Sequence, residues 1–393
     1  MLFSVLTFGV CRVNAQAPVG WTAHPPVIYA PVSSIKPNVV FANATPPFTP
    51  AEIQGAYGLS SLKLPNPTGA GVTVAIVDAY GDDFGGGDTI QSDLQAFCAN
   101  TGLPYSGPNT ASPTLTEPFP ATAPPDQGWA LETALDIEWV HAMAPAAHIV
   151  LVLATNSSDS ALFQRVVYAG ANASVVSMSW GGSEFSSETS FDSDFLALNV
   201  SYFASTGDDG AGTEYPSVSP NVTAVGGTSL TIASNNDWVD ETGWSGSGGG
   251  VSTYEPFASF QAPWVASGNR EVPDISADAD PNTGVEVIQG GAEYQVGGTS
   301  LAAPLWSGIT AVLDGNLSQP IGESALHTAL YQLGDPASID LNFHDITSGS
   351  NGFNAGPGYD LVTGIGSPIV NVLLPKIVAP PPSAPTGLTV VSN

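Results

Sequence analysis

The stretch QVGGTSLAAPLWSGI, residues 295–309, places one serine between a glycine-rich turn and an apolar run with helical spacing. Gly298 and Thr299 precede Ser300, and Pro304 follows it by four residues. This arrangement presents a hydroxyl at a helix N-terminus, where the helix dipole and free N–H groups favour a developing anion. A serine nucleophile also needs a base that accepts its proton. The sequence therefore raises the question of which residue takes the proton of Ser300.

Histidine, the usual base, has no recognisable setting in this chain. None of the histidines lies in the His-Gly-Thr-His sequence that supplies the base of subtilisin-like enzymes; they are His24, His141, His148, His327 and His344. We expect structural roles for His141 and His148, which flank a predicted helix end and a strand start. A neutral Ser-His-Asp protease stays open as an alternative, because Asp78 in AIVDAYGDD follows a predicted strand, where such an enzyme holds its aspartate.

The segment WALETALDIEW, residues 129–139, offers carboxylates instead. Glu132 and Asp136 are four residues apart, so a helix places both side chains on one face. Their neighbours are mostly apolar, and two facing carboxylates in a partly buried cleft share a proton. A base of this kind works at acid pH, where histidine is protonated. The alternative is a solvated acidic face, to which Glu138 would also belong.

Three motifs together resemble the sedolisins, the serine-carboxyl peptidases: GGTSLAAP (297–304), ETALDIEW (132–139) and STGDDGAG (205–212). The resemblance extends from about residue 48 to residue 374 and implies a subtilisin-like fold. It implies that Ser300 is the nucleophile, Glu132 the general base, and Asp136 the hydrogen-bond partner of Glu132. The family holds a protonated Asp in its oxyanion hole, and the match falls on Asp208, although adjacent Asp209 leaves the register open by one residue.

Two details of the motifs bear on this resemblance. Gly297 stands where the family usually has Ser in its S-G-T-S-x-x-x-P motif. VSMSWGG (176–182) resembles the family's strand beside the substrate, whose backbone would pair with an extended peptide.

A Gly/Asn/Ser-rich segment, residues 344–368, contains two aspartates, Asp345 and Asp360. Without the resemblance, a plain glycine-rich loop would be the better interpretation. The segment is similar to the sedolisin calcium loop, which implies one structural Ca²⁺ held by oxygen ligands. The ligands would be the carboxylates of Asp345 and Asp360 and the carbonyls of Ile346, Gly356 and Gly358, with water.

Alternating strands and helices must position these groups. Continuous apolar or β-branched runs predict buried parallel strands at 71–79, 148–154, 174–180 and 201–207. Helical spacing predicts helices at 89–102, 129–145, 160–172 and 191–200. The repetition predicts an α/β doubly wound fold with a mostly parallel sheet flanked by helices. Residues 222–295 are richer in Gly and Ser, for which we expect loops, shorter strands and an antiparallel margin.

The excess of acidic residues restricts the kinds of molecule that this chain can bind. The chain has 35 Asp and Glu against 6 Lys and Arg, a formal net charge of -29. This charge repels nucleic acid and anionic membranes, so we expect protein or peptide substrates, no nucleic acid, no membrane and a monomer. Many carboxyl groups are neutral near their ordinary pKa values of about 4, which suits an acid working pH. Salt adaptation or simple solubility is the alternative.

The chain divides into four predicted parts. Residues 1–15 resemble a signal peptide without the usual basic start, and residues 16–47 form a proline-rich arm. Residues 48–377 form the peptidase domain, and residues 378–393 a proline-rich linker, which either begins a fibronectin type III module or is an ordinary tail. The sequence thus predicts a secreted acid endopeptidase. A tripeptidyl-peptidase of the same family and a non-catalytic, calcium-stabilised surface module are the alternatives.

Overall fold

The computed structural model describes residues 17–31, 43–81, 89–119, 123–262, 264–265 and 267–379. The predicted signal peptide and nearly all of the predicted linker lie outside these residues. Within the described part of the chain, no helix combines the length and the apolar character needed to cross a membrane.

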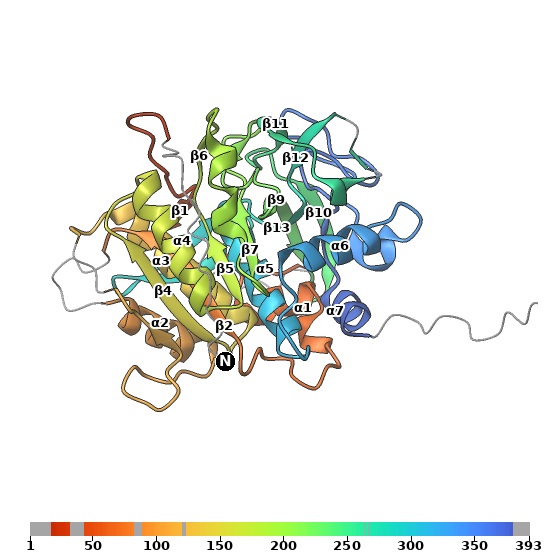
Figure 1. Cartoon of the computed structure of the whole chain (residues 1–393). Helices are drawn as coiled ribbons and strands as arrows, with labels where there is room; N and C mark the ends of the chain where they lie inside the picture. The colour runs from red at the N-terminus through yellow and green to blue at the C-terminus, as the bar shows by residue number, and fades with distance from the viewer. Residues whose placement is uncertain are drawn as a thin grey trace, which may run out of the picture.

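An eight-stranded sheet forms the centre of the molecule (Figure 1). Its strands, in spatial order, are β10 (Trp238–Gly243), β9 (Thr223–Ile232), β7 (Ser201–Ser205), β5 (Val175–Met178), β2 (Thr73–Ala79), β4 (His148–Ala154) and β3 (Leu115–Thr116), with β13 (Ile275–Asp278) also paired to β9. All of these pairs are parallel except β10 with β9. The predicted α/β fold with a mostly parallel sheet is confirmed.

Alternate residues of the central strands face two different cores, as the pleat of a strand requires. In β2, Val74 and Ile76 belong to the larger core, while Ala75 and Val77 belong to the second core. The same alternation places Asp78 on the face of the larger core.

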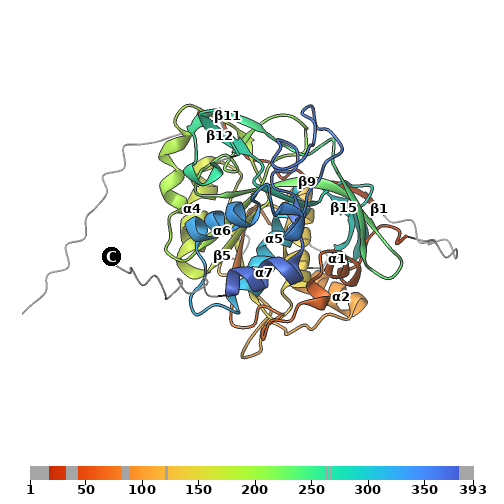
Figure 2. The ribbon, with the colours of Figure 1, turned by 90° about the vertical axis from the view of Figure 1, so that its right-hand side faces the viewer.

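Helices cover both faces of the sheet. The larger core holds α1 (Pro50–Ala56), α2 (Ile90–Thr101), α3 (Gln127–Met143), α5 (Thr299–Asp314) and α7 (Val370–Val378). Figure 2 looks onto this side, with α7 and α1 beside α5. The second core lies under α4 (Asp159–Asn172). Because α3 and α5 pack side by side under the sheet, their polar side chains can meet.

Two sequence expectations differ from the structure. The predicted helix at 191–200 is a single 3-10 turn, Asp192–Phe195. The Asp192 carboxylate accepts hydrogen bonds from Ser219 and Tyr215, and its carbonyl accepts one from Asn221, so these partners replace helical ones. The strands expected to be short at 222–295 include β9, which has 10 residues.

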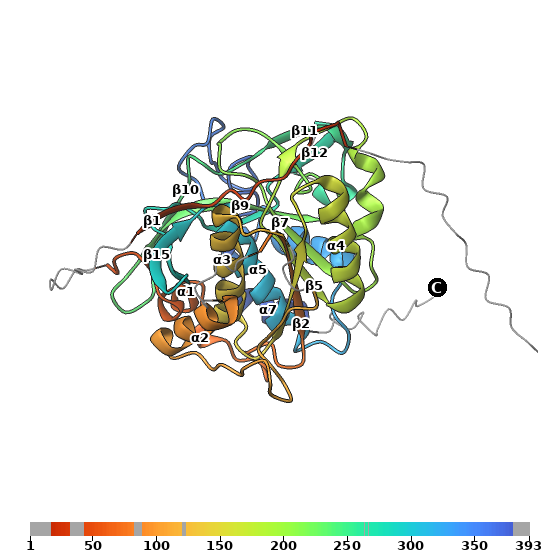
Figure 3. The same cartoon turned by 90° about the vertical axis from the view of Figure 1, so that its left-hand side faces the viewer.

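Smaller antiparallel sheets surround the main one. One contains β1 (Ile28–Pro31), β15 (Ala292–Gly297) and β14 (Val285–Gln289) in that order. The others are two-stranded: β6 (Gly182–Ser183) with β8 (Glu214–Tyr215), β11 (Gly250–Pro256) with β12 (Asn269–Val272), and β16 (Phe343–His344) with β17 (Ser367–Pro368). Helix α6 (Glu323–Leu333) follows α5. Figure 3 shows the segment that leads to β1, in red, crossing the molecule.

Candidate active site

Ser300 is the second residue of α5, where backbone N–H groups have no acceptor within the helix. The preceding Gly298 has φ of 110°, a conformation that favours glycine. A Cβ at Gly298 would lie 2.2 Å from the Pro26 carbonyl oxygen and 2.5 Å from Asp208 Oδ2. The turn before Ser300 is therefore one that only glycine fits.

Glu132 and Asp136 lie on α3, which is buried from Trp129 to Met143. The alternative of a solvated acidic face is therefore wrong: Glu138 is buried too, and it accepts a hydrogen bond of 3.0 Å from the Ile288 backbone N–H. The Ser300 hydroxyl lies close enough to Glu132 to lower the pKa of its carboxyl, although outside regular hydrogen-bond geometry. Neither group has another hydrogen-bond partner within the described chain.

A third carboxyl group joins this pair. Asp78, near the end of β2, faces the same buried space, and burial raises its pKa to about 7. Burial, and then repulsion from the neighbouring carboxylates, raises the pKa of Glu132 and of Asp136 well above their ordinary values. Ser179, directly after β5, donates a hydrogen bond of 2.6 Å to Asp136 Oδ1 and partly offsets this rise. The three carboxyls therefore bind protons more readily than exposed carboxyls do.

Asp208 faces the start of α5 from the end of β7. Its Oδ1 accepts hydrogen bonds from the Thr299 backbone N–H at 2.7 Å and the Thr299 hydroxyl at 3.0 Å. Its Oδ2 is buried without a partner, and burial raises the pKa of the carboxyl well above its ordinary value. Asp209 is exposed. Of the two residues between which the sequence could not choose, Asp208 is therefore the one whose carboxyl lies against the start of α5.

Four of the histidines make contacts elsewhere. His141 Nε2 lies 2.7 Å from the Pro104 carbonyl, and His148 Nε2 lies 3.0 Å from the Thr116 hydroxyl. His344 stacks on Trp238, and His327 belongs to a buried cluster described below. The structure does not bring His141 or His148 to Ser300.

His24 does lie at the site, which the sequence did not indicate. Its backbone N–H and carbonyl pair with Gly181 at 3.0 and 3.3 Å. Residues 24–28 line a cavity of ≈ 250 Å³ together with Asp208, Asp209 and Glu214. Burial, and then the charge of Asp209, raises the pKa of Glu214 to about 7. A proline-rich sequence carries no signal for such a position, since it predicts only an extended chain.

Comparison with known proteins identifies this arrangement. Residues 127–326, just over half of the chain, match the model of the subtilase family. Kumamolisin of Bacillus sp. (strain MN-32) is 33% identical over 374 residues, which cover 84% of this chain and 64% of kumamolisin. The solved Pseudomonas sedolisin, a serine-carboxyl proteinase complexed with two molecules of pseudo-iodotyrostatin, superposes with a TM-score of 0.72 at 28% identity, covering 85% of this chain and 98% of that one. The chain belongs to the sedolisins, within the subtilase family.

Sedolisins are serine-carboxyl peptidases, which are hydrolases, and the predicted family is thereby confirmed. A more distant relative is tripeptidyl-peptidase 1 of Rattus norvegicus, 30% identical over 224 residues, covering 47% of this chain and 38% of the relative. The chain spans less than two thirds of the length of the first curated relatives that it matches.

The loop at 344–368 contains Asp345 and Asp360, the two carboxylates that the sequence analysis assigned to a hard cation. Asp345 accepts a hydrogen bond of 3.0 Å from the Gly358 N–H, and Asp360 accepts one of 2.9 Å from the Gly356 N–H. Burial raises the pKa of both carboxyls, so each anion lacks full compensation. Among the described residues, no group of three or more His, Cys, Asp and Glu could hold a metal ion. A calcium ion would therefore need backbone carbonyls besides these two carboxylates.

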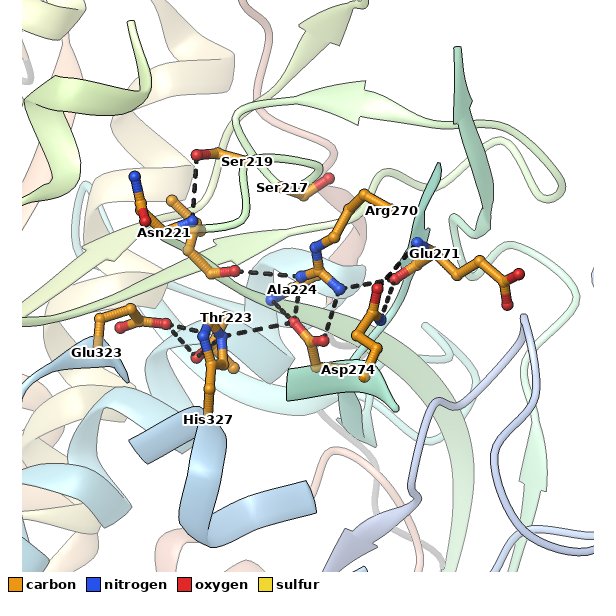
Figure 4. Close-up of polar contacts among 12 residues, drawn as sticks. Ser217, Ser219, Asn221, Thr223, Ala224, Arg270, Glu271, Asp274, Glu323 and His327 are labelled. Carbon is orange, nitrogen blue, oxygen red and sulfur yellow. Dashed lines mark hydrogen bonds and ion pairs between the residues drawn. The ribbon is translucent and has the colours of Figure 1, made fainter. Parts of the chain in front are cut away.

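A second buried polar cluster ties β12, β9 and α6 together (Figure 4). Arg270 is fully buried and donates to both oxygens of Asp274, at 2.7 and 2.5 Å. His327 Nε2 lies 2.9 Å from Glu323 and 3.9 Å from Asp274. The sequence did not indicate this cluster, because its members are up to 104 residues apart.

Proposed function

We propose that this sedolisin is a secreted serine-carboxyl endopeptidase that works at acid pH through Ser300, Glu132 and Asp136. One observation carries the proposal. The Ser300 hydroxyl faces the Glu132 carboxylate in a buried space where neither has a competing partner. A hydroxyl and a carboxylate so arranged are a nucleophile and its base.

Acylation begins when Ser300 Oγ attacks the carbonyl carbon of the substrate and Glu132 accepts the hydroxyl proton. The carbonyl oxygen becomes an oxyanion, which the Ser300 N–H and the Asp208 carboxylic acid stabilise. Asp208 Oδ1 already accepts two hydrogen bonds from Thr299, so its proton belongs on Oδ2, the oxygen without a partner. Protonated Glu132 then donates its proton to the leaving amine as the C–N bond breaks.

Deacylation repeats these roles with water. Glu132 accepts a proton from water, which attacks the ester carbonyl, and the C–O bond to Ser300 breaks with return of the proton to Oγ. Asp136 supports Glu132 by sharing the proton of the buried pair, and the hydrogen bond from Ser179 fixes its orientation.

The two protonation requirements define the working pH. Glu132 must be ionised to accept a proton, whereas Asp208 must keep its proton to donate a hydrogen bond. Burial raises the pKa of both groups. The active form therefore exists between the pH at which the Glu132–Asp136 pair loses a proton and the higher pH at which Asp208 loses its proton. Activity should therefore fall at both ends of a pH profile.

The path of the chain favours an endopeptidase over a tripeptidyl-peptidase. The segment from Trp21 to Tyr29 lies along the cleft and continues on both sides of the turn at Gly298. A cleft that holds an extended chain for several residues before the reacting group accepts internal peptide bonds. The discriminating test is a peptide substrate with a blocked amino terminus, which an endopeptidase cleaves and a tripeptidyl-peptidase does not.

The loop at 344–368 would hold one structural Ca²⁺. Asp345 and Asp360 would provide carboxylates, and Ile346, Gly356 and Gly358 would provide carbonyls. The ion would compensate the charge of two half-buried carboxylates and lock the loop, with no part in the chemistry.

The primary experiment is hydrolysis of a denatured protein from pH 2 to 9 by the chain and by two variants. Ser300→Ala and Glu132→Gln should each lower kcat by at least about 10³-fold, leaving what binding and the oxyanion site contribute. A neutral or alkaline optimum would point to a histidine base, and full activity of Glu132→Gln would exclude Glu132. Unchanged circular dichroism spectra would show that the variants fold.

A further inference from the structure

The loop that carries Asp208 (the oxyanion loop, residues 206–212) is hydrogen-bonded along its backbone to a glycine-rich segment (the glycine segment, residues 245–250). Four hydrogen bonds join the two on both sides of Asp208: Gly248 N–H to the Gly207 carbonyl at 2.8 Å, Gly210 N–H to the Gly246 carbonyl at 2.9 Å, and a two-way exchange between Gly212 and Gly249 at 2.9 Å each. A Cβ at Gly248 would lie 1.8 Å from the Thr206 carbonyl oxygen, so the two backbones touch. The position of the Asp208 carboxyl therefore depends on the position of the glycine segment.

Asn351 connects these two backbones to a third segment. It is a buried residue of the loop at 344–368. Its Nδ2 donates to the Ser247 carbonyl at 2.7 Å and to the Leu361 carbonyl at 3.1 Å. Its own carbonyl accepts a hydrogen bond of 2.7 Å from the Ala211 N–H of the oxyanion loop. Asn351 thus holds the glycine segment with its side chain and the oxyanion loop with its backbone.

The Asn351 amide is fixed in one orientation. Its Oδ1 accepts a hydrogen bond of 3.0 Å from the Phe353 N–H, which leaves both hydrogens of Nδ2 for the two carbonyls. An amide has this pair of donors, whereas a carboxylate of the same size has none. Without the amide, the Ser247 hydroxyl would still attach the glycine segment, because it donates to the Val362 carbonyl at 2.8 Å. We therefore expect loss of the amide to shift the segment and not to detach it.

The contact between Asn351 and the oxyanion loop is too close for the two to move independently. Gly210, two residues after Asp208, has φ of 78°, and a Cβ there would lie 2.8 Å from the Asn351 carbonyl oxygen. The Ala211 N–H binds that same oxygen. Thr299 holds Oδ1 of Asp208 at the start of α5. The Asp208 carboxyl is therefore positioned from two sides, by α5 and by Asn351.

We propose that Asn351 is a positioning residue for catalysis, which holds the oxyanion loop so that the Asp208 carboxyl reaches the oxyanion. The inference rests on the proposed function, because Asp208 acts there as an oxyanion donor. Asn351 takes no proton and forms no bond to the substrate in this role. It acts through the place that it gives to Asp208, and a misplacement of about 1 Å can lower a rate by about 10²-fold.

The test measures kcat, KM and the pH profile of peptide hydrolysis for the full chain and for Asn351→Ala, with Asn354→Ala as the matched control. Asn354 is an exposed asparagine of the same loop. In Asn351→Ala we expect kcat to fall by about 10- to 100-fold with little change in KM, because the oxyanion exists only after the substrate has bound. Asn354→Ala should match the unsubstituted chain.

The alkaline limit of kcat should also move to lower pH in Asn351→Ala. Burial is the largest cause of the raised pKa of Asp208, and a displaced loop exposes this carboxyl to water. The carboxyls that face Asp208, those of Glu214, Asp209 and Glu132, are the same in both proteins. A variant that is merely less stable would lose active protein without a shift of this limit.

A double variant, Asp208→Ala with Asn351→Ala, shows whether Asn351 acts through Asp208. Once Asp208 is absent, removal of the Asn351 amide should lower kcat by less than about twofold further. Asn351→Asp keeps the shape and the Oδ1 acceptor but at most one donor, and it takes the place of Asn351→Ala in every comparison should the alanine variant fail to fold.

The outcomes separate this inference from the proposed function. A full additional loss of kcat in the double variant would overturn the positioning role and leave Asp208 as the donor. The same conclusion would follow if Asn351→Ala kept the kcat and the alkaline limit of the unsubstituted chain. Full activity of Asp208→Ala alone would overturn the oxyanion part of the proposed function, and this inference with it.

Discussion

Asp208 divides its two carboxyl oxygens between two tasks. Oδ1 accepts from Thr299 and fixes the side chain against the start of α5, and Oδ2 is left buried with no acceptor or donor. An ionised carboxylate could not donate from Oδ2, so the function proposed for this residue depends on its raised pKa.

Variants of Asp208 separate its role as a hydrogen-bond donor from the effect of its ionisation. Asp208→Ala should lower kcat by about 10²–10³-fold, the usual effect of losing one oxyanion donor. Asp208→Asn should lose less, because an amide donates at every pH, and its alkaline limit should move upward. The measurement is kcat/KM against pH for both variants. An alkaline limit that stays in place in Asp208→Asn would assign that limit to another group.

Ser179 affects the base through Asp136. Its hydroxyl stabilises the ionised form of Asp136 and so holds the pKa of that carboxyl below the value that burial alone would set. Ser179→Ala should therefore raise the pKa of the Glu132–Asp136 pair and shift the acid limit of kcat to higher pH, with roughly a 10-fold loss of activity at low pH.

Ser177 is the matched control for this variant. It is a buried serine in β5, two residues before Ser179, and its hydroxyl has no hydrogen-bond partner in the described chain. Ser177→Ala should leave the acid limit unchanged. Equal shifts in the two variants would mean that packing, not the hydrogen bond to Asp136, controls the limit.

At the scale of elements, the site is formed where strands β2, β5 and β7 end opposite α3 and α5. The sequence predicted these elements because their apolar runs and helical spacing are long and regular. It also predicted that Glu132 and Asp136 share a helix face, since that follows from a spacing of four. It could not predict that Asp78 joins them, because a polar residue at a strand end does not specify which helix will cover it.

The sequence did not resolve segments whose conformation depends on tertiary contacts. The segment at 191–200 has helical spacing, yet Leu196 and Leu198 are exposed and polar contacts of Asp192 replace a helix. The arm around His24 has no pattern at all, and its position depends on the free edges at Gly181 and β15. Tertiary pairing of this kind is set by the completed fold.

The buried ion pair of Figure 4 links elements that hydrophobic packing alone leaves separate. Burial would raise the pKa of Asp274, but the charge and hydrogen bonds of Arg270 outweigh this and lower it. Asp274→Ala should destabilise the fold by about 3–5 kcal/mol, because it leaves the Arg270 charge buried and unpaired. Urea unfolding measures this loss, with Glu271→Gln, a half-buried neighbour, expected to change stability by less than about 0.5 kcal/mol. Similar losses in both variants would contradict the role of the pair.

The proposed calcium loop gives a prediction at the same scale. A cation that binds only the folded state raises its stability, so chelation should lower the melting temperature and added Ca²⁺ should restore it. Asp345→Asn should abolish this response to Ca²⁺. An identical melting temperature with chelator and with Ca²⁺ would remove the metal from the proposal.

At the scale of the whole molecule, acidic side chains lie in the interior of the fold as well as on its surface. Burial raises the pKa of Asp78 to about 7, of Glu188 to about 8 and of Glu255 to about 9. A carboxyl whose folded pKa lies above its unfolded value binds its proton more tightly in the folded state. Its contribution to stability is complete below the unfolded pKa and is lost as the pH rises through the folded value.

Asp274 works in the opposite direction, because its folded pKa is lowered. Its contribution is present above the unfolded pKa of about 4 and is lost as the pH falls below it. The contribution of the buried acids thus reaches its full value at low pH, whereas that of the ion pair is lost as the pH falls through the lowered pKa of Asp274. The two effects together place maximal stability near pH 4, close to the proposed working range.

Thermal unfolding of the Ser300→Ala variant, which avoids self-digestion, tests this balance. The melting temperature should be highest near pH 4 and fall steadily between about pH 5 and pH 9, as the buried carboxyls and the net charge of -29 both come to oppose folding. High salt separates the two causes, because it screens the surface charges and leaves the buried ones nearly unscreened. A decline that persists in 1 M salt belongs to the buried carboxyls. A melting temperature that rises from pH 4 to pH 8 would mean that the buried acids are ionised in the folded protein, and the protonated Asp208 on which the chemistry depends would lose its support.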